Sequence, residues 1–376
     1  MPRMLHDLQR LICCETPTAD LAAVAAGAAL VDEIGAGYLG GGAERIVLDG
    51  RTHLRWRLGG DDPVAVESTT RVLLVTHQDT VWPIGTRQRL PYRVDAGMLY
   101  GPGCFDMKTG LVMAFHALAL LGAAGTFPAV TLLVTGDEEI GSPTSRALIE
   151  QEARSATAAF VLEASADAGA LKTGRKGVSL YQVSATGRAA HAGLEPEKGI
   201  NAGVEIAAQV LAINDFGDAS AGTSVVPTAL TAGTTSNTVP GAAVLSVDSR
   251  AWTRDEQDRV HTAMSGLRST VPGAAVTVTG GINRPPMERA GSQPLFALAQ
   301  RLAEQLGSGV LQQTSVGGAS DGNFTAGVGC PTLDGLGAVG GGAHADTEHV
   351  VVAEIPRRTA LLAGLIDAVC GGAAAG

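Results

Sequence analysis

Residues 71–83 read RVLLVTHQDTVWP. The apolar run at the start predicts a short buried strand. His77 and Asp79 stand where that strand would end, just before a turn at Trp82 and Pro83. One interpretation is a polar strand terminus with a hydrogen-bonded histidine. The other is a site at the strand end, in which case neighbouring strands should also end in polar residues.

Apolar runs and helical segments alternate on both sides of this stretch. We expect strands at 44–58, 71–76, 129–135 and 158–164. A buried helix is expected over about 107–121, and two further helices within residues 1–38, separated by a break at Pro17. This alternation is typical of an α/β fold with a mostly parallel sheet.

The middle of the chain has a different pattern. The expected elements are a strand at 177–186, a helix at about 199–213, strands at about 225–233 and 242–251, a helix from Thr253 and a strand ending near 280. This β-α-β-β-α-β order is ferredoxin-like. We therefore expect residues 175–285 to form a small domain inserted into a larger one built from residues 1–174 and 286–376.

Composition excludes several functional classes. The chain has 376 residues, 45% of them apolar, and a net charge of −10, which argues against binding nucleic acid or an anionic membrane. Its five cysteines form no CxxC pair, and we interpret them as reduced thiols of a cytoplasmic protein. The N-terminus does not resemble a secretory signal. The apolar segment 21–31 is expected to be too short to span a bilayer.

Polar residues follow the other expected strands. Glu138 and Glu139 follow the strand at 129–135, and Glu163 follows the run AAFVL. Asp106 precedes the buried helix, and His344 lies in a glycine-rich loop. Each has a simpler explanation: a helix cap for Asp106, a solvated turn for the paired glutamates, a salt bridge for Glu163 and a surface position for His344. Their joint occurrence at strand ends and loops favours a common site.

Carboxylates and imidazoles in this ratio suit a divalent transition metal, usually zinc, with cobalt or manganese as substitutes. Two ions that share one aspartate, each with one histidine and one glutamate, would use all five residues. Glu138 would then be a general base beside a ligand. Asp79 would accept the second ring N–H of His77 and fix its tautomer.

Five motifs, in order along the chain, resemble those of a family of dizinc metallopeptidases. That family includes glutamate carboxypeptidases of the carboxypeptidase G type, acetylornithine deacetylase, succinyl-diaminopimelate desuccinylase and aminoacylase. The motifs are HQDTVWP (77–83), GPGCFDMKTG (101–110), GDEEIGS (136–142), LEAS (162–165) and GGGAHADTEHV (340–350). The resemblance extends over essentially the whole chain and is greatest for the glutamate carboxypeptidase branch, which has glutamate at the position of Glu163.

The resemblance implies a role for each residue. One zinc ion would be held by His77, Asp106 and Glu163, and the other by Asp106, Glu139 and His344. Glu138 would be the base, with Asp79 supporting His77. A cis peptide bond is implied between Asp106 and Met107.

The inserted domain of this family implies a lid and a homodimer interface. His191, in GRAAHAG, resembles a histidine that reaches the active site of the partner subunit and polarises the scissile carbonyl. Asn237 and Arg250 resemble a pair that grips the substrate carboxylate, although Arg250 could instead pair with Asp248 or Asp255. For His191 the alternative is a turn histidine.

Two more positions, Gly318 and Asp321 in GGASDGN, resemble a loop that lines the substrate pocket. Arg175 and Lys176 could bind an acidic substrate side chain, but a solvated basic hinge is the favoured interpretation.

The expected function is a zinc-dependent metallo-carboxypeptidase that releases a C-terminal, glutamate-like amino acid from a small peptide or an N-acyl amino acid. The alternatives are a deacylase of the acetylornithine deacetylase, desuccinylase or aminoacylase type and, more remotely, an inactive binding protein on the same fold.

Overall fold

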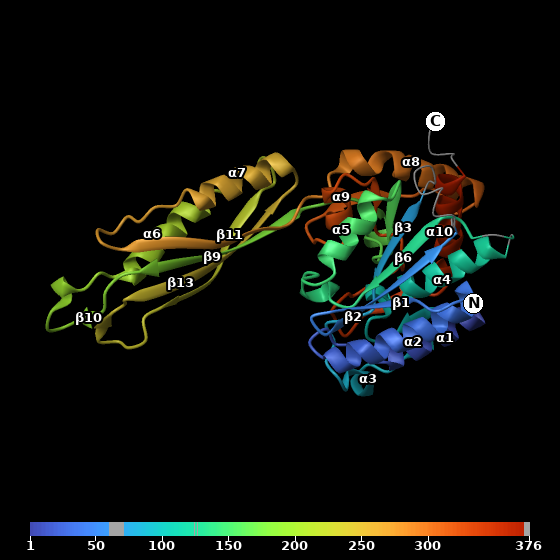
Figure 1. The fold of residues 1–376 in the computed structure, drawn as a ribbon, viewed down its shortest axis with the longest axis horizontal. Helices are drawn as coiled ribbons and strands as arrows, with labels where there is room; N and C mark the ends of the chain where they lie inside the picture. Colours follow the sequence, from blue (N-terminus) through green and yellow to red (C-terminus); the bar gives the residue numbers. More distant parts are fainter. Residues whose placement is uncertain (60–70, 124, 126, 372–376) are drawn as a thin grey trace. The chain divides into compact units, whose positions relative to one another are not determined.

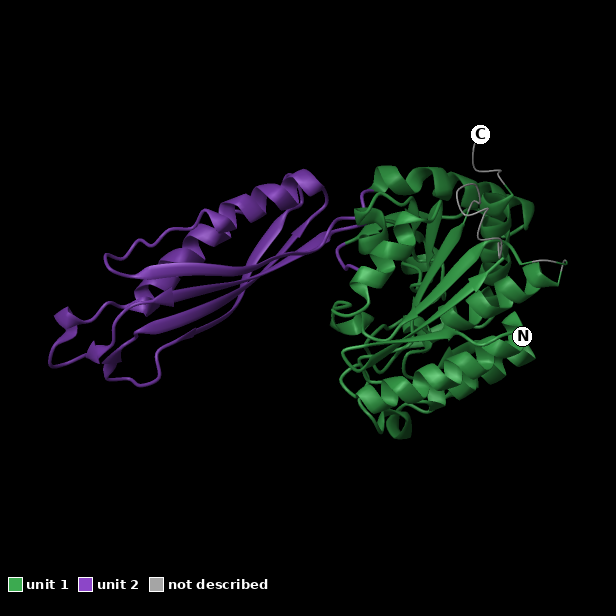
Figure 2. Cartoon of the chain, viewed as in Figure 1, with its two compact units in different colours: residues 1–174, 289–316, 320–376 green, residues 175–288, 317–319 purple. Residues whose placement is uncertain are grey.

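The computed structural model describes residues 1–59, 71–123, 125 and 127–371. The chain forms two compact units (Figure 2). Unit 1 comprises Met1–Gly174, Arg289–Val316 and Ser320–Gly376, and unit 2 comprises Arg175–Glu288 and Gly317–Ala319. The sequence placed the breaks after residues 174 and 285. The second break lies later because Met287 pairs with the backbone of Arg175.

A six-stranded sheet forms the centre of unit 1 (Figure 1). Its strands, in spatial order, are β1 (Glu44–Leu48), β2 (Arg51–Leu58), β6 (Val130–Thr135), β3 (Val72–His77), β7 (Ala158–Val161) and β16 (Thr332–Leu333). Strands β6, β3, β7 and β16 are parallel, whereas β1 and β2 form an antiparallel edge. The predicted α/β fold is confirmed.

The edge strands form a hairpin, so the segment at 44–58 is two strands. Asp49 and Gly50 both have positive φ, 48° and 79°. Asp-Gly is the sequence that favours such a tight turn, because both central residues must adopt left-handed backbone angles.

Helices cover both faces of the sheet. Val72 and Leu74 of β3 join the larger hydrophobic core, while Leu73 and Val75 join a second core on the other face. The larger core includes side chains of α1 (Pro2–Cys13), α2 (Leu21–Leu39), α4 (Thr109–Gly122), α8 (Arg289–Gln305) and α10 (Glu354–Cys370). The second core lies beneath α5 (Arg146–Arg154) and α9 (Gly322–Gly327). Burial on both faces explains why the strands are continuous apolar runs.

One predicted helix begins later than expected. The helix expected from residue 107 becomes regular only at Thr109, because Asp106 and Met107 have non-helical backbone angles within the irregular turn Cys104–Lys108. The Asp106–Met107 peptide bond is cis, as expected.

The apolar segment at 21–31 is part of the 19-residue helix α2, so the expectation that it is too short to span a bilayer was wrong on length. By length and composition alone, α2 and Cys104–Gly122 could each cross a membrane. Both contribute side chains to the larger core.

Shorter elements complete unit 1. They are α3 (Thr86–Arg89), an antiparallel sheet of β17 (Gly340–Gly341), β18 (His349–Val351), β5 (Met98–Tyr100) and β4 (Arg93–Asp95), and the pair β15 (Gln313–Val316) and β8 (Leu171–Arg175). The sheet with β17 and β18 brings the loop that carries His344 beside the segment that precedes Asp106.

Unit 2 has the predicted ferredoxin-like order (Figure 1). Its elements are β9 (Gly177–Thr186), α6 (Ala202–Asn214), β11 (Ser224–Ala232), β13 (Ala242–Ala251), α7 (Arg254–Ser265) and β14 (Ala275–Arg284), with a small pair, β10 (Ala190–His191) and β12 (Thr238–Val239). The strands form an antiparallel sheet, β11-β13-β9-β14. Alternate residues of β9, such as Tyr181 and Val183, are buried beside α6 and α7.

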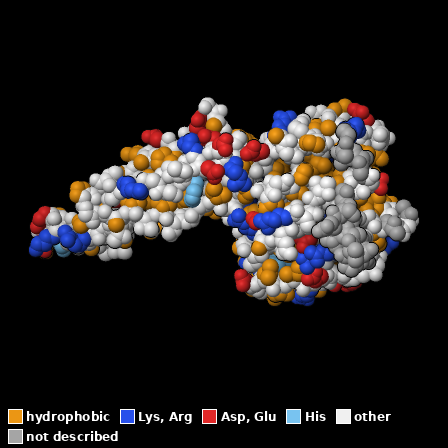
Figure 3. All heavy atoms as spheres, turned by 45° about the horizontal axis from the view of Figure 1, so that its top comes forward, with side chains coloured by type: hydrophobic (Ala, Val, Ile, Leu, Met, Phe, Trp, Pro, Cys, Tyr) orange, Lys and Arg blue, Asp and Glu red, His pale blue; other side chains and the backbone are white. Residues whose placement is uncertain are grey.

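Charged side chains of both signs are exposed. In the view of Figure 3, lysine and arginine side chains lie in small groups beside aspartate and glutamate. This distribution agrees with the negative net charge and offers no broad basic face in that view.

Candidate metal centre

Three neighbouring parallel strands end at the same edge of the main sheet. β3 ends at His77, β6 is followed by a single helical turn at Glu138–Ile140, and β7 is followed by Glu163. In a parallel sheet this is the carboxyl edge, where α/β proteins place their sites.

The structure brings all five predicted ligands together around Asp106. Asp106 Oδ1 lies 3.3 Å from His77 Nε2, and Oδ2 lies 3.3 Å from His344 Nε2. His77 Nε2 is 3.7 Å from Glu163 Oε1, and His344 Nε2 is 3.2 Å from Glu139 Oε2. One carboxylate therefore stands between two histidine–glutamate pairs, which is the arrangement of a shared ligand.

Glu138 also lies at this site. Donor atoms of His77, Glu138 and Glu163 fall within 4.8 Å of one another, as do those of His77, Asp106 and Glu139. Geometry alone does not separate a ligand from a base here, so the role of Glu138 rests on chemistry.

The residues fit a pair of divalent cations. Among the described residues, no hydrogen-bond partner reaches the buried Oε1 of Glu139. Hydrogen bonds to Asp106 and Glu139 raise the pKa of His344 to about 10. Burial opposes protonation of His77, but Asp106 and Asp79 outweigh it and raise the pKa of that imidazole. Concentrated negative charge of this kind is what a divalent cation would neutralise.

Asp79 supports the site differently from the prediction. His77 Nδ1 lies 2.9 Å from the backbone carbonyl oxygen of Asp79, whereas the nearest carboxylate oxygen is 3.5 Å away. The carbonyl is therefore the closer acceptor for the ring N–H. The buried carboxylate accepts hydrogen bonds from Thr18 Oγ1 at 2.7 Å and from the backbone N–H groups of Glu138 and Glu139 at 3.3 Å. Asp79 thus orients both the histidine and the turn of the candidate base.

A network of hydrogen bonds connects the segment just before the turn at Glu138–Ile140 to His53 of the sheet. The Gly136 N–H donates to His53 Nδ1 at 3.2 Å, which leaves the ring proton on Nε2, 3.0 Å from Thr144 Oγ1. Thr144 Oγ1 donates to Asp137 at 2.6 Å. Burial lowers the pKa of His53 and keeps its ring neutral.

Glu348 is a residue of the site that the sequence did not reveal. Its buried carboxylate accepts hydrogen bonds from the backbone N–H groups of Gly103, Phe105 and Asp106 and from the Trp82 indole. It lies in the quoted motif GGGAHADTEHV, but main-chain donors carry no sequence signal. Only the position of an acid four residues after His344, within that motif, pointed to it.

The loop residues of GGASDGN divide between the units. Asp321 is only 2% exposed and accepts hydrogen bonds from Thr135 Oγ1, at 3.2 Å, and from Ser142 Oγ. It therefore connects the end of β6 to the turn that contains Ser142. Gly318 belongs to unit 2, where its carbonyl accepts a hydrogen bond from Arg175 at 3.0 Å. Arg175 is 3% exposed, so the interpretation of a solvated hinge was wrong for this residue.

The remaining candidates lie in unit 2. Arg250 pairs with Asp248 through two hydrogen bonds of 3.0 and 3.1 Å, which is the simpler alternative, and also donates to the Gly317 carbonyl at 3.0 Å. His191 is exposed, and its Nδ1 accepts the N–H groups of Gly193 and Leu194, each at 3.1 Å. The ring proton of neutral His191 is therefore on Nε2.

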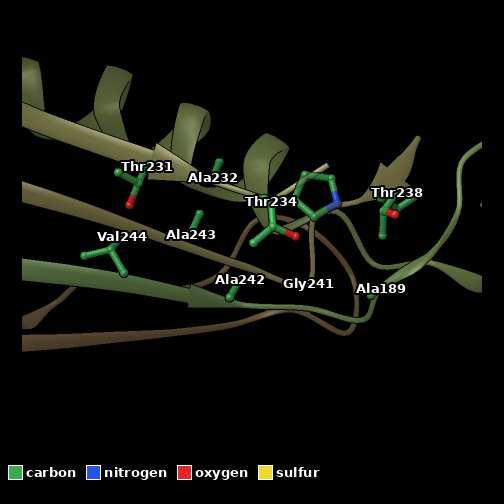
Figure 4. Close-up of a pocket in the computed structure, with 12 residues that line it drawn as sticks. Ala189, Thr231, Ala232, Thr234, Thr238, Gly241, Ala242, Ala243 and Val244 are labelled. Carbon is green, nitrogen blue, oxygen red and sulfur yellow. The ribbon is translucent and has the colours of Figure 1, made fainter. Parts of the chain in front are cut away.

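His191 and Asn237 lie at neighbouring positions. The Ala192 N–H donates to the Asn237 carbonyl at 2.8 Å, and His191 pairs with Thr238 across β10 and β12. A pocket of unit 2 borders Thr238 and is lined only by alanine, glycine, proline, threonine and valine (Figure 4). None of these side chains carries a charge.

Comparisons with known proteins agree with this geometry. Residues 73–368 match the model of peptidase family M20/M25/M40. The chain is 34% identical to carboxypeptidase G2 of Pseudomonas sp. (strain RS-16) over 302 residues, which cover 78% of this chain and 73% of that protein. It is 27% identical to succinyl-diaminopimelate desuccinylase of Variovorax paradoxus (strain S110) over 319 residues, 78% of this chain and 80% of the relative.

A solved structure shares the fold. The YXEP protein of Bacillus subtilis, described as a dinuclear metal-binding peptidase from the M20 family, superposes with a TM-score of 0.66 at 13% identity and covers 98% of both chains. The shared motifs, the matched family model and the gathered carboxylates and histidines lead to one conclusion: the chain is a metallopeptidase of family M20/M25/M40.

Proposed function

We propose that the chain is a dizinc carboxypeptidase that releases a glutamate-like C-terminal amino acid from a small peptide or an N-acyl amino acid. The observation that supports it best is the position of Asp106, with one carboxylate oxygen near each of two histidines. The similarity to carboxypeptidase G2 supports the choice of substrate class.

The donor set supports two zinc ions. One ion would be held by His77, Asp106 and Glu163, and the other by Asp106, Glu139 and His344. Nitrogen and carboxylate ligands of this kind suit zinc, and cobalt or manganese would substitute. When bound, the two ions would polarise the scissile carbonyl and acidify a water molecule.

Glu138 is the proposed base. Its side chain is buried beside the proposed ligands, and its backbone N–H is fixed by Asp79. Glu138 would take a proton from the attacking water as the water oxygen bonds to the carbonyl carbon. It would then deliver that proton to the amine nitrogen as the C–N bond breaks, so the base ends the cycle unchanged.

The substrate carboxylate would be held by unit 2. A guanidinium has five N–H donors, and the hydrogen bonds to Asp248 and Gly317 use three of those of Arg250. Arg250 can therefore be oriented by Asp248 and still bind a carboxylate, with Asn237 as a neutral donor. His191 would donate a hydrogen bond from Nε2 to the scissile carbonyl of a substrate that is bound in the active site of a partner subunit. This role requires a homodimer formed through unit 2. Gly318 would present backbone near the substrate.

A deacylase of the desuccinylase type is the second candidate, because the desuccinylase of Variovorax paradoxus aligns over a similar share of the chain.

The five cysteines are free thiols, which supports a cytoplasmic location.

A substrate panel tests the proposal. The zinc- and cobalt-loaded protein is incubated with N-acyl-glutamates, folate-type glutamates, dipeptides, N-acetylornithine and N-succinyl-diaminopimelate, and products are identified by mass spectrometry. Fastest release of glutamate supports the carboxypeptidase. Fastest cleavage of the succinyl or acetyl compound supports the deacylase, and metal binding without any hydrolysis supports the inactive binding protein.

A further inference from the structure

The Glu348 side chain connects three of the motifs that form the metal centre. Its carboxylate is 3% exposed. Oε2 accepts the Gly103 N–H at 2.8 Å and the Trp82 indole N–H at 2.9 Å, while Oε1 accepts the N–H groups of Phe105 and Asp106 at 2.8 and 3.1 Å. Each oxygen therefore has two donors.

Such an arrangement compensates a buried charge. A carboxylate removed from water is costly unless hydrogen bonds replace its hydration. Here three of the four donors are backbone N–H groups of one short loop, which form a concave anion-binding nest. The contact at Asp106 acts on the backbone of the residue whose carboxylate faces both histidines.

The same residue also fixes the loop of His344. Glu348 lies four positions after His344, and its N–H donates to the Ala345 carbonyl at 2.9 Å. His344 adopts a φ of 60°, a left-handed conformation that non-glycine residues rarely adopt. A conformation of that kind persists only where surrounding contacts determine it, and Glu348 supplies such a contact.

We propose that Glu348 is a positioning residue that sets the separation of His344 from Asp106 and thereby the affinity for the ion that these two residues share. It touches neither substrate nor metal and acts through the backbone of Gly103–Asp106 and the turn at Trp82. The inference rests on the proposed metal site.

The substitution Glu348→Gln tests this role. A glutamine keeps the size of the side chain but has one acceptor oxygen, and its NH₂ group would face two N–H donors. At least part of the nest would lose its acceptor, so the loop of Asp106 would shift. Substitutions that disturb groups supporting metal ligands typically lower metal affinity by about 10- to 100-fold, and we expect a loss in that range.

Glu152→Gln is the matched control. Glu152 is 4% exposed, lies in the same unit and pairs with Arg55 and Arg57 at 2.7 and 2.6 Å. Both variants remove one buried negative charge, but only Glu348 contacts the metal loops. Glu152→Gln should lower the unfolding temperature and leave metal affinity unchanged.

The experiment titrates the metal-free full-length proteins with zinc against a competing chelator, and records the visible spectrum of the cobalt-loaded forms. Weaker binding of one ion and an altered cobalt spectrum in Glu348→Gln alone support the inference. Wild-type affinity and spectrum in Glu348→Gln, with only a lower unfolding temperature, overturn it.

Two outcomes need separate treatment. If Glu348→Gln does not fold, Glu348→Asp is titrated instead: it keeps the charge but is too short to reach all three N–H groups, so weaker binding is again expected and wild-type affinity overturns the inference. If the wild-type chain itself binds no metal, both the proposed site and this inference fail. If the wild type binds metal and the variant binds it with the same affinity, only the proposed role of Glu348 is refuted.

Discussion

Asp106 Oδ2 lies 3.3 Å from Nε2 of His344, although the two residues belong to different segments of unit 1, one before and one after the residues of unit 2 in the chain. The contact joins the segment before α4 to the loop before β18. The other carboxylate oxygen of Asp106 faces His77, so in the proposed dizinc site His344 would share only one of the two ions with Asp106.

Replacing His344 should therefore weaken the binding of one ion and leave the binding of the other intact. In His344→Asn we expect one tightly bound zinc ion to remain with His77, Asp106 and Glu163, while the affinity of the second falls by at least about 10-fold. Metal titration of the purified variant measures both affinities. If His344→Asn lost both ions together, the two histidine–glutamate pairs would not bind their ions independently, and the prediction would be wrong.

Glu138→Ala should abolish turnover and keep both ions. General-base catalysis contributes about 100- to 10,000-fold, so kcat should fall by at least about 100-fold. Metal content and initial rates are measured on the same sample. If the variant loses metal, Glu138 is a ligand, as its closeness to His77 and Glu163 also permits.

Arg250→Ala should weaken recognition of the substrate carboxylate. A hydrogen bond to a charged group contributes about 1.5–3 kcal/mol, so kcat/KM should fall by about 10- to 100-fold. The control is a substrate whose carboxylate is replaced by a carboxamide. The wild type should cleave this substrate poorly, and Arg250→Ala should cleave it at about the same rate as the wild type does. Equal losses on both substrates would assign Arg250 to the structure of unit 2 through Asp248.

Acid should destabilise unit 1 through His53. Its pKa is lowered from 6.5 in the folded chain by burial. As pH falls below 6.5 the unfolded state binds a proton that the folded state does not, so stability is retained above that pH and lost below it.

His53→Asn removes this titration. Its free energy of unfolding should depend less on pH than that of the wild type, by at most about 1.4 kcal/mol per pH unit. Chemical denaturation at several pH values between about 5 and 7.5, around the ordinary histidine value, checks this. If the free energy of unfolding depended on pH to the same extent in the two proteins, the His53 ring would take up no proton on unfolding.

The sequence predicted features that depend on local pattern. Strand 177–186 alternates apolar and polar residues and was placed at its observed bounds. The positions of His77, Glu139 and Glu163 followed from a general property of parallel sheets, whose strands end at one edge.

Features that depend on main-chain partners were not predictable. The Asp79 carbonyl, rather than its carboxylate, is the closer acceptor for His77. Arg175 was expected in solvent but is buried by the backbone of residues 287 and 318. Glu348 accepts hydrogen bonds from three backbone N–H groups, which any residue except proline would supply. In each case the partner is main-chain atoms brought close by the fold, so residue types do not encode it.

Metal stoichiometry tests the shared ligand most directly. The zinc content of the wild type and of Asp106→Asn is measured by elemental analysis after equilibrium dialysis against a fixed free zinc concentration. We predict two ions per wild-type chain and loss of both from the variant, since Asp106 serves each. One ion per wild-type chain, or two ions retained by Asp106→Asn, would contradict the account.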